Sequence, residues 1–228
     1  MAPFLVVNAD DFGASPGINL GIVEAHTDGI VTSTSCMVTG PALDEAVALS
    51  AEHPRLSIGL HWDVFGEDEE ANIDLSDRGA VRDDFDRQLG RFRELFGREP
   101  THVDSHKHAH RSLEAMPVVQ EVVEPLGVPL RHDGRVRYLG HFYAQWRYLE
   151  TDLEHVRVPY LQTLLRDEVG DGWTELGCHP GYITPDFRSI YLHERETELQ
   201  TLTDPRVRET IDELGITLAG FADYGRDG

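Results

Sequence analysis

Acidic and histidine side chains stand at the ends of several short strand-like runs of this sequence. Asp10 and Asp11 follow the apolar run at residues 4–7, and His61 and His179 close two later runs. In parallel α/β folds the carboxyl ends of the strands share one rim, and ligands bind there. Residues that are far apart in the sequence can therefore converge on one metal ion and one substrate. The pattern predicts the site of a metal-dependent enzyme.

Asp10 and Asp11 form a pair of adjacent carboxylates. Two carboxylates this close repel each other, so one of them needs a neutralising partner. A divalent cation is such a partner, and it would leave one Asp on the metal and the other free to accept a proton. The alternative is structural, because Asp also favours positions where it caps a turn.

Four histidines fall within residues 101–110. His106, His108 and His110 alternate, so in an extended segment they would share one face. One of them would bind the metal and the others would line the pocket, while Asp104 could orient an imidazole. The alternative is a surface histidine tract that binds metal adventitiously. The pattern is not the HExxH motif of a zinc protease helix.

One Asp and two His suit Zn²⁺ or another first-row divalent ion better than the oxygen ligands that Mg²⁺ prefers. A bound ion lowers the pKa of water and polarises a carbonyl, so hydrolysis of an amide or ester is the most direct reaction. His179 is a candidate general acid because its ordinary pKa lies near neutrality, although it could also be a plain turn residue. The sequence has no GxSxG, P-loop or GxGxxG motif, which disfavours serine hydrolases, kinases and dehydrogenases.

Length and charge narrow the class further. The 228 residues suffice for one domain, and we expect a single unit over residues 1–228. A net charge of -21 argues against nucleic acid or an anionic membrane as partner. No apolar run approaches the roughly 20 residues of a membrane span, and no signal peptide is evident, so a cytoplasmic location is expected. Cys36 and Cys178 are expected to be buried, reduced thiols.

Strand and helix patterns alternate along the chain, which favours βαβ units and a parallel sheet. About seven strands are expected, fewer than a full TIM barrel, so an incomplete or distorted (β/α) TIM-like barrel fits best and an open doubly wound sheet is the alternative. The stretch 134–146 could carry a substrate surface. The expected strands are 4–8, 32–38, 56–60, 101–103, 128–130, 173–178 and 216–219; the expected helices are 18–27, 43–52, 81–96, 113–123, 153–169, 191–202 and 205–214.

Five motifs in this order resemble the YdjC-like carbohydrate deacetylases, which include the chitooligosaccharide deacetylases. They are residues 8–13 (NADDFG), 29–34 (GIVTST), 59–61 (GLH), 101–110 (THVDSHKHAH) and 178–181 (CHPG). The resemblance implies an incomplete (β/α) barrel and metal-dependent removal of an N-acetyl group from an amino sugar or its oligomer. It also implies a homodimer as the oligomeric state to test, because members of the family are often dimers.

Carried over by position, the resemblance implies that Asp11, His61 and His106 hold one divalent metal ion, Zn²⁺ or Mg²⁺. It implies that Asp10 is the general base and that His179 is the acid or an oxyanion partner. His108 or His110 could take the place of His179 in that role.

Further residues are expected at the substrate. His108, His110, Arg131 and Trp62 are candidate substrate contacts, and Trp62, Tyr143 or Trp146 could stack on a sugar face. The sequence departs from the family after residue 61, where Trp-Asp-Val-Phe-Gly follows in place of apolar residues and a Leu-Thr pair. This change lies where the substrate should bind, so the resemblance does not identify the sugar.

Two other functions are weighed against the deacetylase. A metal-dependent phosphoesterase on a similar barrel would need more than one metal and basic groups for the phosphate, and it is disfavoured because Arg131 and Lys107 are the only obvious basic candidates at the rim. A non-catalytic, metal-dependent carbohydrate-binding protein would have no use for a spare Asp10 beside Asp11.

Overall fold

Seven strands form one parallel sheet in the computed structural model, which describes residues 2–65, 70–147, 149–185 and 189–225. The strands lie in the order β4-β3-β2-β1-β6-β5, and β7 pairs with the beginning of β1. Every ladder between them is parallel. Their bounds are β1 Pro3–Phe12, β2 Ser33–Cys36, β3 Ser57–Trp62, β4 Val103–Ser105, β5 Arg137–Leu139, β6 Gly172–Cys178 and β7 Thr217–Leu218.

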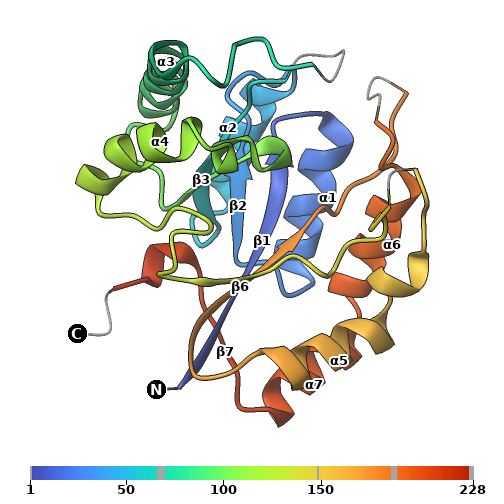
Figure 1. Cartoon of the computed structure of the whole chain (residues 1–228). Helices are drawn as coiled ribbons and strands as arrows, with labels where there is room; N and C mark the ends of the chain where they lie inside the picture. Colours follow the sequence, from blue (N-terminus) through green and yellow to red (C-terminus); the bar gives the residue numbers. More distant parts are fainter. Residues whose placement is uncertain (1, 66–69, 148, 186–188, 226–228) are drawn as a thin grey trace.

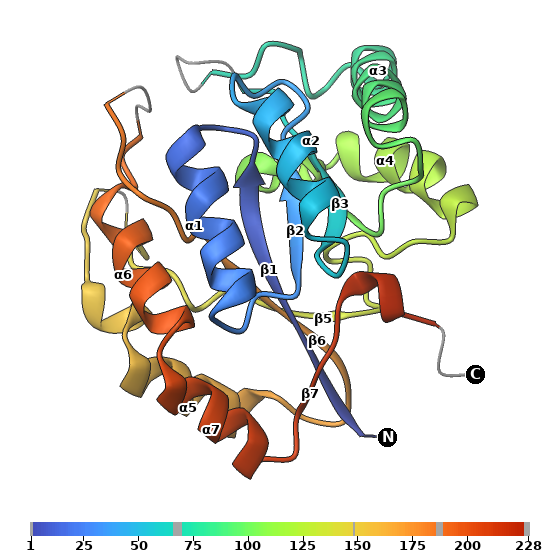
Figure 2. The ribbon, with the colours of Figure 1, turned by 180° about the vertical axis from the view of Figure 1, so that it is seen from behind.

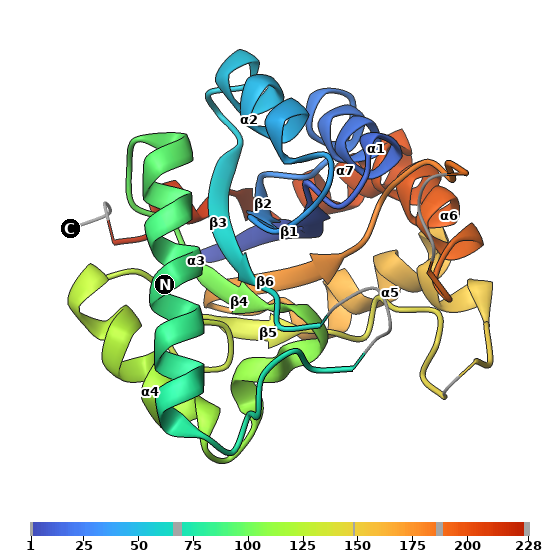
Figure 3. The same ribbon diagram turned by 90° about the horizontal axis from the view of Figure 1, so that it is seen from above.

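The sheet curls into part of a barrel, and the helices lie on its outer side (Figures 1 and 3). The expected incomplete TIM-like barrel is therefore confirmed. Figure 2 shows α1, α2 and α6 from behind, side by side along the outside of the curled sheet. The helices are α1 Pro16–Thr27, α2 Leu43–Glu52, α3 Arg78–Phe96, α4 Ala115–Val123, α5 Val158–Glu168, α6 His193–Leu202 and α7 Pro205–Glu213.

Local sequence signals explain where the helices begin and end. The Ser15 hydroxyl accepts a hydrogen bond from the amide of Ile18 at the start of α1, and Pro16 occupies the first turn, where its missing N–H costs nothing. Gly97 ends α3 in the left-handed conformation at φ 63°.

The central strand β1 is buried on both faces, because helices cover one face and the side chains of the curled sheet cover the other. Its apolar side chains join a core that runs through β2, β3 and the inner faces of the helices. Cys36 and Cys178 are free, buried thiols, as expected. No helix in the described ranges is long and apolar enough to cross a membrane.

The expected strand at residues 128–130 is wrong. Leu130 makes only an isolated parallel bridge to Val103, and the chain then turns at His132, whose φ is 70°. Pro129 has no N–H to donate to a ladder, which limits pairing there. A strand that the sequence analysis does not expect, β5, pairs with β6 at the other edge of the sheet and lies inside the stretch 134–146 that the sequence suggested for substrate.

Candidate active site

Three strands deliver the expected metal ligands to one point on the rim. Asp11 lies near the end of β1, His61 near the end of β3, and His106 directly after β4. The Oδ1 atom of Asp11 lies 3.3 Å from Nε2 of His61 and 3.2 Å from Nδ1 of His106. Asp11 has a φ of 73°, a left-handed conformation that Asp tolerates better than most residues. The structure therefore brings the three predicted ligands together.

The chemistry of this donor set fits a divalent cation. One oxygen and two imidazole nitrogens lie within 4.8 Å of one another. Asp11 Oδ1 and His61 Nε2 are buried and accept or donate no hydrogen bond among the described residues. Burial alone would lower the pKa of His61, but Asp104 and Asp11 raise it well above the usual value. The surrounding carboxylates thus favour a positive charge at the place where a cation would sit.

Asp104 orients the His61 ring. Its Oδ1 lies 2.6 Å from His61 Nδ1, and the Ser35 hydroxyl lies 3.2 Å from the same nitrogen. Asp104 faces His61 because β3 and β4 pair those two positions in register. A carboxylate on one imidazole nitrogen fixes the tautomer and leaves the other nitrogen available to a metal. The expected orienting role of Asp104 agrees with this contact.

Asp10 is held by the guanidinium of Arg131. Its two oxygens accept hydrogen bonds from Nη1 and Nη2 of Arg131 at 2.7 and 2.8 Å, and Asn8 donates a third at 2.8 Å. Burial would raise the pKa of Asp10, but Arg131 lowers it below the usual value. Arg131 also pairs with Asp104 at 2.8 Å and with Glu175 at 2.5 Å.

Arg131 does not occupy the substrate surface for which the sequence suggested it. Its side chain is 1% exposed, and its donors are directed at the three carboxylates. Burial raises the pKa of Glu175 to about 7 even though Arg131 opposes the shift. The expectation is corrected because the ion pairs with these carboxylates hold the guanidinium in the interior.

His179 lies beside Asp10 on the turn after β6. Its Nε2 is 3.9 Å from Oδ2 of Asp10, and its ring lies 5.6 Å from the ring of Tyr143. Burial lowers the pKa of His179 to about 4, so the ring is neutral at pH 7. The turn is packed closely against α1, where a Cβ on Gly21 would approach Gly181 to 2.5 Å.

The histidine-rich segment is not extended, which corrects the expectation that alternate histidines share a face. Residues 106–111 form a short 3₁₀ turn with Lys107 and His108 at φ 50° and 53°. His110 is fully buried, contacting the Ser105 hydroxyl and the carbonyl of Arg131, so it cannot touch a substrate here. His108 packs against the rings of His132 and Tyr138.

Trp62 does not lie at the surface, where the sequence analysis expected it to contact the substrate. It follows His61 in β3, and successive side chains of a strand point to opposite faces. The indole is fully buried against Phe85 of α3 and donates to Asp84 at 2.9 Å. It cannot stack on a sugar. Tyr143 is half-buried, and Trp146 is 55% exposed with its ring stacked on His155.

Two residues of the site escaped the sequence analysis. Glu175 lies in the middle of β6, and a charged residue inside a buried apolar strand is a signal that could have found it. Arg195 lies on α6 and donates to Oδ2 of Asp11 at 2.6 Å. Nothing in its sequence spacing points to that contact.

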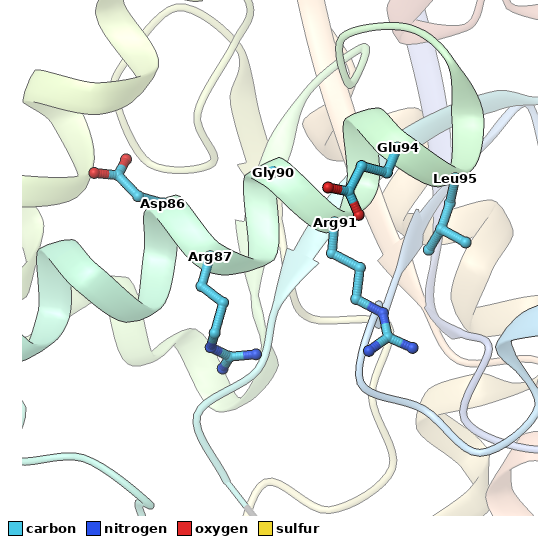
Figure 4. Close-up of a pocket in the computed structure, with 6 residues that line it drawn as sticks. All are labelled: Asp86, Arg87, Gly90, Arg91, Glu94 and Leu95. Carbon is cyan, nitrogen blue, oxygen red and sulfur yellow. The ribbon is translucent and has the colours of Figure 1, made fainter.

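Surface depressions elsewhere do not involve these residues. Figure 4 shows one along α3, lined by two acidic side chains, two arginines, Gly90 and Leu95. A second lies between the end of α1 and the start of α7. Neither contains a candidate site residue.

Comparisons with known proteins place the chain in a family. The sequence model described as YdjC-like protein matches residues 4–213. A protein of Serratia marcescens named chitooligosaccharide deacetylase is 35% identical, and the alignment covers 98% of this chain and all of the relative.

Solved structures show the same fold. A protein of Enterococcus faecalis V583, named for cellobiose-phosphate cleavage, superposes with a TM-score of 0.80 at 26% identity over 97% of this chain and 98% of its own. A family 4 carbohydrate esterase of Streptomyces lividans, solved with acetate, gives a TM-score of 0.60 at 11% identity over 95% and 91% of the two chains. The second likeness speaks for the fold alone. The match over residues 4–213 shows that the chain belongs to the YdjC-like protein family.

Proposed function

We propose that the protein is a metal-dependent hydrolase that removes an N-acetyl group from an amino sugar or a short, chitooligosaccharide-like oligosaccharide. The observation that carries the proposal is the Asp11, His61 and His106 donor set with the carboxylate of Asp10 beside it. Membership of the YdjC-like family and the name of the Serratia relative support the same reaction. We propose that residues 1–228 act as one such domain.

The metal would be held by Asp11, His61 and His106. When bound, a divalent ion would polarise the acetamide carbonyl and acidify a water molecule. Two imidazole nitrogens favour Zn²⁺ or a similar first-row ion over Mg²⁺. Asp104 supports this arrangement because it fixes the His61 ring.

Asp10 would be the general base. Arg131 fixes the carboxylate by a two-pronged contact and keeps it ionised, so it is ready to accept a proton from the attacking water. The lowered pKa makes Asp10 a weaker base than an unpaired carboxylate, so the water must itself be acidified for the transfer to proceed. That requirement agrees with a metal in the neighbouring donor set.

His179 would face the reacting carbonyl as an oxyanion partner and as the route of the proton to the departing amine. With a pKa of about 4, the ring is neutral before reaction and offers one N–H donor. Oδ2 of Asp10 lies 3.9 Å from Nε2 of His179, so Asp10 could pass the proton to the imidazole after the water has been deprotonated.

The sugar would lie between the rim and the segment after β5. Tyr143 contacts the His179 ring and stacks on Tyr191 at 4.6 Å, so it is the aromatic residue best placed beside the reacting group. Trp146 is the more exposed ring farther along the same segment. A cytoplasmic location and a homodimer stay predictions from the sequence.

The two rival functions are less well supported by the site. A phosphoesterase needs cationic groups for its substrate, but Arg131 and Arg195 are both engaged by carboxylates, and Lys107 lies over the ring of Phe65 at 5.0 Å. A non-catalytic binder has no need of an ionised Asp10 held next to the donor set.

Acetate release from N-acetylglucosamine, its 6-phosphate and chitobiose tests the proposal. The metal-loaded protein should release acetate from at least one of them, and Asp10→Asn should abolish release while the protein still binds metal. Unchanged turnover in Asp10→Asn would exclude Asp10 as the base. No release from any substrate by protein with metal bound would refute deacetylation of these sugars.

A further inference from the structure

Arg195 makes a buried contact with the carboxylate of Asp11. Its Nη2 donates to Oδ2 at 2.6 Å, and the two side chains are 5% and 3% exposed. The other oxygen, Oδ1, is the one directed at His61 and His106, and it lacks a hydrogen-bond partner among the described residues. Oδ2 of Asp11 is therefore paired with Arg195, whereas Oδ1 faces the two histidines.

The guanidinium of Arg195 is fixed on its other sides by backbone. Its Nε donates to the carbonyl of Tyr191 at 3.1 Å, and Nη1 lies 3.5 Å from the carbonyl of His179. The carbonyl of Arg195 itself accepts from the amide of Gly181 at 3.3 Å. These contacts tie α6 to the turn that carries His179, so the donor aimed at Asp11 has a defined direction.

Glu198, one helical turn after Arg195 in α6, also contacts the segment that carries His179. It is fully buried, accepts from the His179 amide at 2.5 Å and accepts from the Tyr191 hydroxyl at 2.5 Å. Arg195 and Glu198 are three residues apart, so they share one face of the helix. That face is the inner face, which reaches both the predicted ligand and the predicted proton donor.

We infer that Arg195 is a positioning residue that restricts Asp11 to binding the metal through a single oxygen. The inference rests on the proposed metal dependence. A carboxylate can bind a cation through one or both oxygens, and the ion pair with Arg195 competes for Oδ2. Coordination positions that a second Asp11 oxygen would fill would therefore be left for water and for the acetamide oxygen.

A purely structural role for Arg195 makes a different prediction. If the ion pair only stabilised the fold, its loss would lower stability and leave the coordination of the metal unchanged. If Arg195 restricts Asp11, its loss releases Oδ2 to the metal and raises the coordination number. Cobalt(II) distinguishes the two, because its visible absorption weakens as coordination rises from four toward six.

The experiment compares cobalt-loaded wild-type protein with Arg195→Met, Arg195→Gln and Arg195→Lys. Met and Gln should still bind one cobalt ion per chain but show a weaker visible band, and their kcat/KM for acetate release should fall about 10- to 100-fold. Lys keeps the charge and should restore the band toward that of the wild type. Arg206→Met removes an exposed arginine that pairs with Asp204, and it should change neither property.

A wild-type cobalt spectrum in folded Arg195→Met or Arg195→Gln would overturn the inference, and circular dichroism establishes which variant is folded. Gln retains a neutral donor for the backbone carbonyls and serves if Met does not fold. Failure of the wild-type protein to bind cobalt would refute the metal dependence on which the inference rests. The two failures are therefore distinct.

Discussion

Replacement of Arg131 by Met should destabilise the protein strongly at neutral pH. Arg131 is the shared cation of Asp10, Asp104 and Glu175, and its side chain is 1% exposed. Removing one partner of a buried ion pair costs about 3–5 kcal/mol, because charge is left buried without compensation. At about 2–4 °C per kcal/mol for a chain of this size, the melting temperature should fall by about 6–20 °C.

The loss should depend on pH in a defined direction. In the wild-type protein the pKa values of Asp10 and Asp104 are lowered from 3.8, so the stability that they contribute is present above 3.8 and is lost as the pH falls through their folded pKa values. Without Arg131, Asp10 loses the partner that lowers its pKa most while burial still raises it, so protonation of Asp10 relieves the variant. The difference in stability from the wild type should therefore be full at pH 7 and shrink toward pH 4.

Thermal unfolding followed by circular dichroism between pH 4 and pH 8 measures both effects. The matched control is Arg206→Met, in which an arginine with 63% of its side chain exposed loses its ion pair with Asp204. That change should alter stability by less than about 1 kcal/mol. Equal melting temperatures for Arg131→Met and the control, or a difference that does not shrink on acidification, would refute the reasoning.

Three further substitutions test other parts of the account. Asp104→Asn removes the anion that orients His61 and should weaken metal affinity about 10- to 100-fold, as measured by competition with a metal-binding dye. The control Asp212→Asn changes an exposed carboxylate and should leave metal affinity unchanged. Equal affinities for the two variants would exclude the orienting role. Trp62→Phe loses its indole hydrogen bond and about 1 kcal/mol of stability, but KM should not change, and a KM that rises severalfold would put Trp62 at the substrate after all. The pKa of Glu175 is raised by burial from 4.5 to about 7 in the folded protein, so the wild-type protein loses stability as the pH rises from 4.5 to 7. Glu175→Gln lacks this loss, so its free energy of unfolding relative to the wild type should rise over the same range by about 3 kcal/mol at most. Parallel curves of unfolding free energy against pH in chemical denaturation would contradict that pKa.

Strand ends were the part of the structure that the sequence predicted well. The alternation of apolar strands and amphipathic helices is a local property, and it predicts that the residues after these strands, among them Asp11, His61 and His106, share one rim. Parallel pairing then brings them together regardless of small errors in strand bounds. The expected strand at 101–103 is displaced to Val103–Ser105, yet His106 still reaches Asp11.

Side-chain direction was predicted less well, because it depends on backbone details that composition does not encode. The side chains of His61 and Trp62 point to opposite faces of the sheet, because β3 continues one residue beyond the histidine. The left-handed residues Lys107 and His108 break the expected alternation of histidines. Arg195 reaches Asp11 only through the tertiary packing of α6 against the turn that carries His179.

The most direct test of the central claim is a metal titration of EDTA-treated protein during acetate release. The account predicts that activity is absent without metal, rises in proportion to added Zn²⁺ and reaches its maximum at one ion per chain. His61→Ala should remain inactive throughout the titration, because the donor set loses the imidazole that Asp104 orients. Full acetate release by the metal-free protein, or normal restoration of activity in His61→Ala, would contradict the claim.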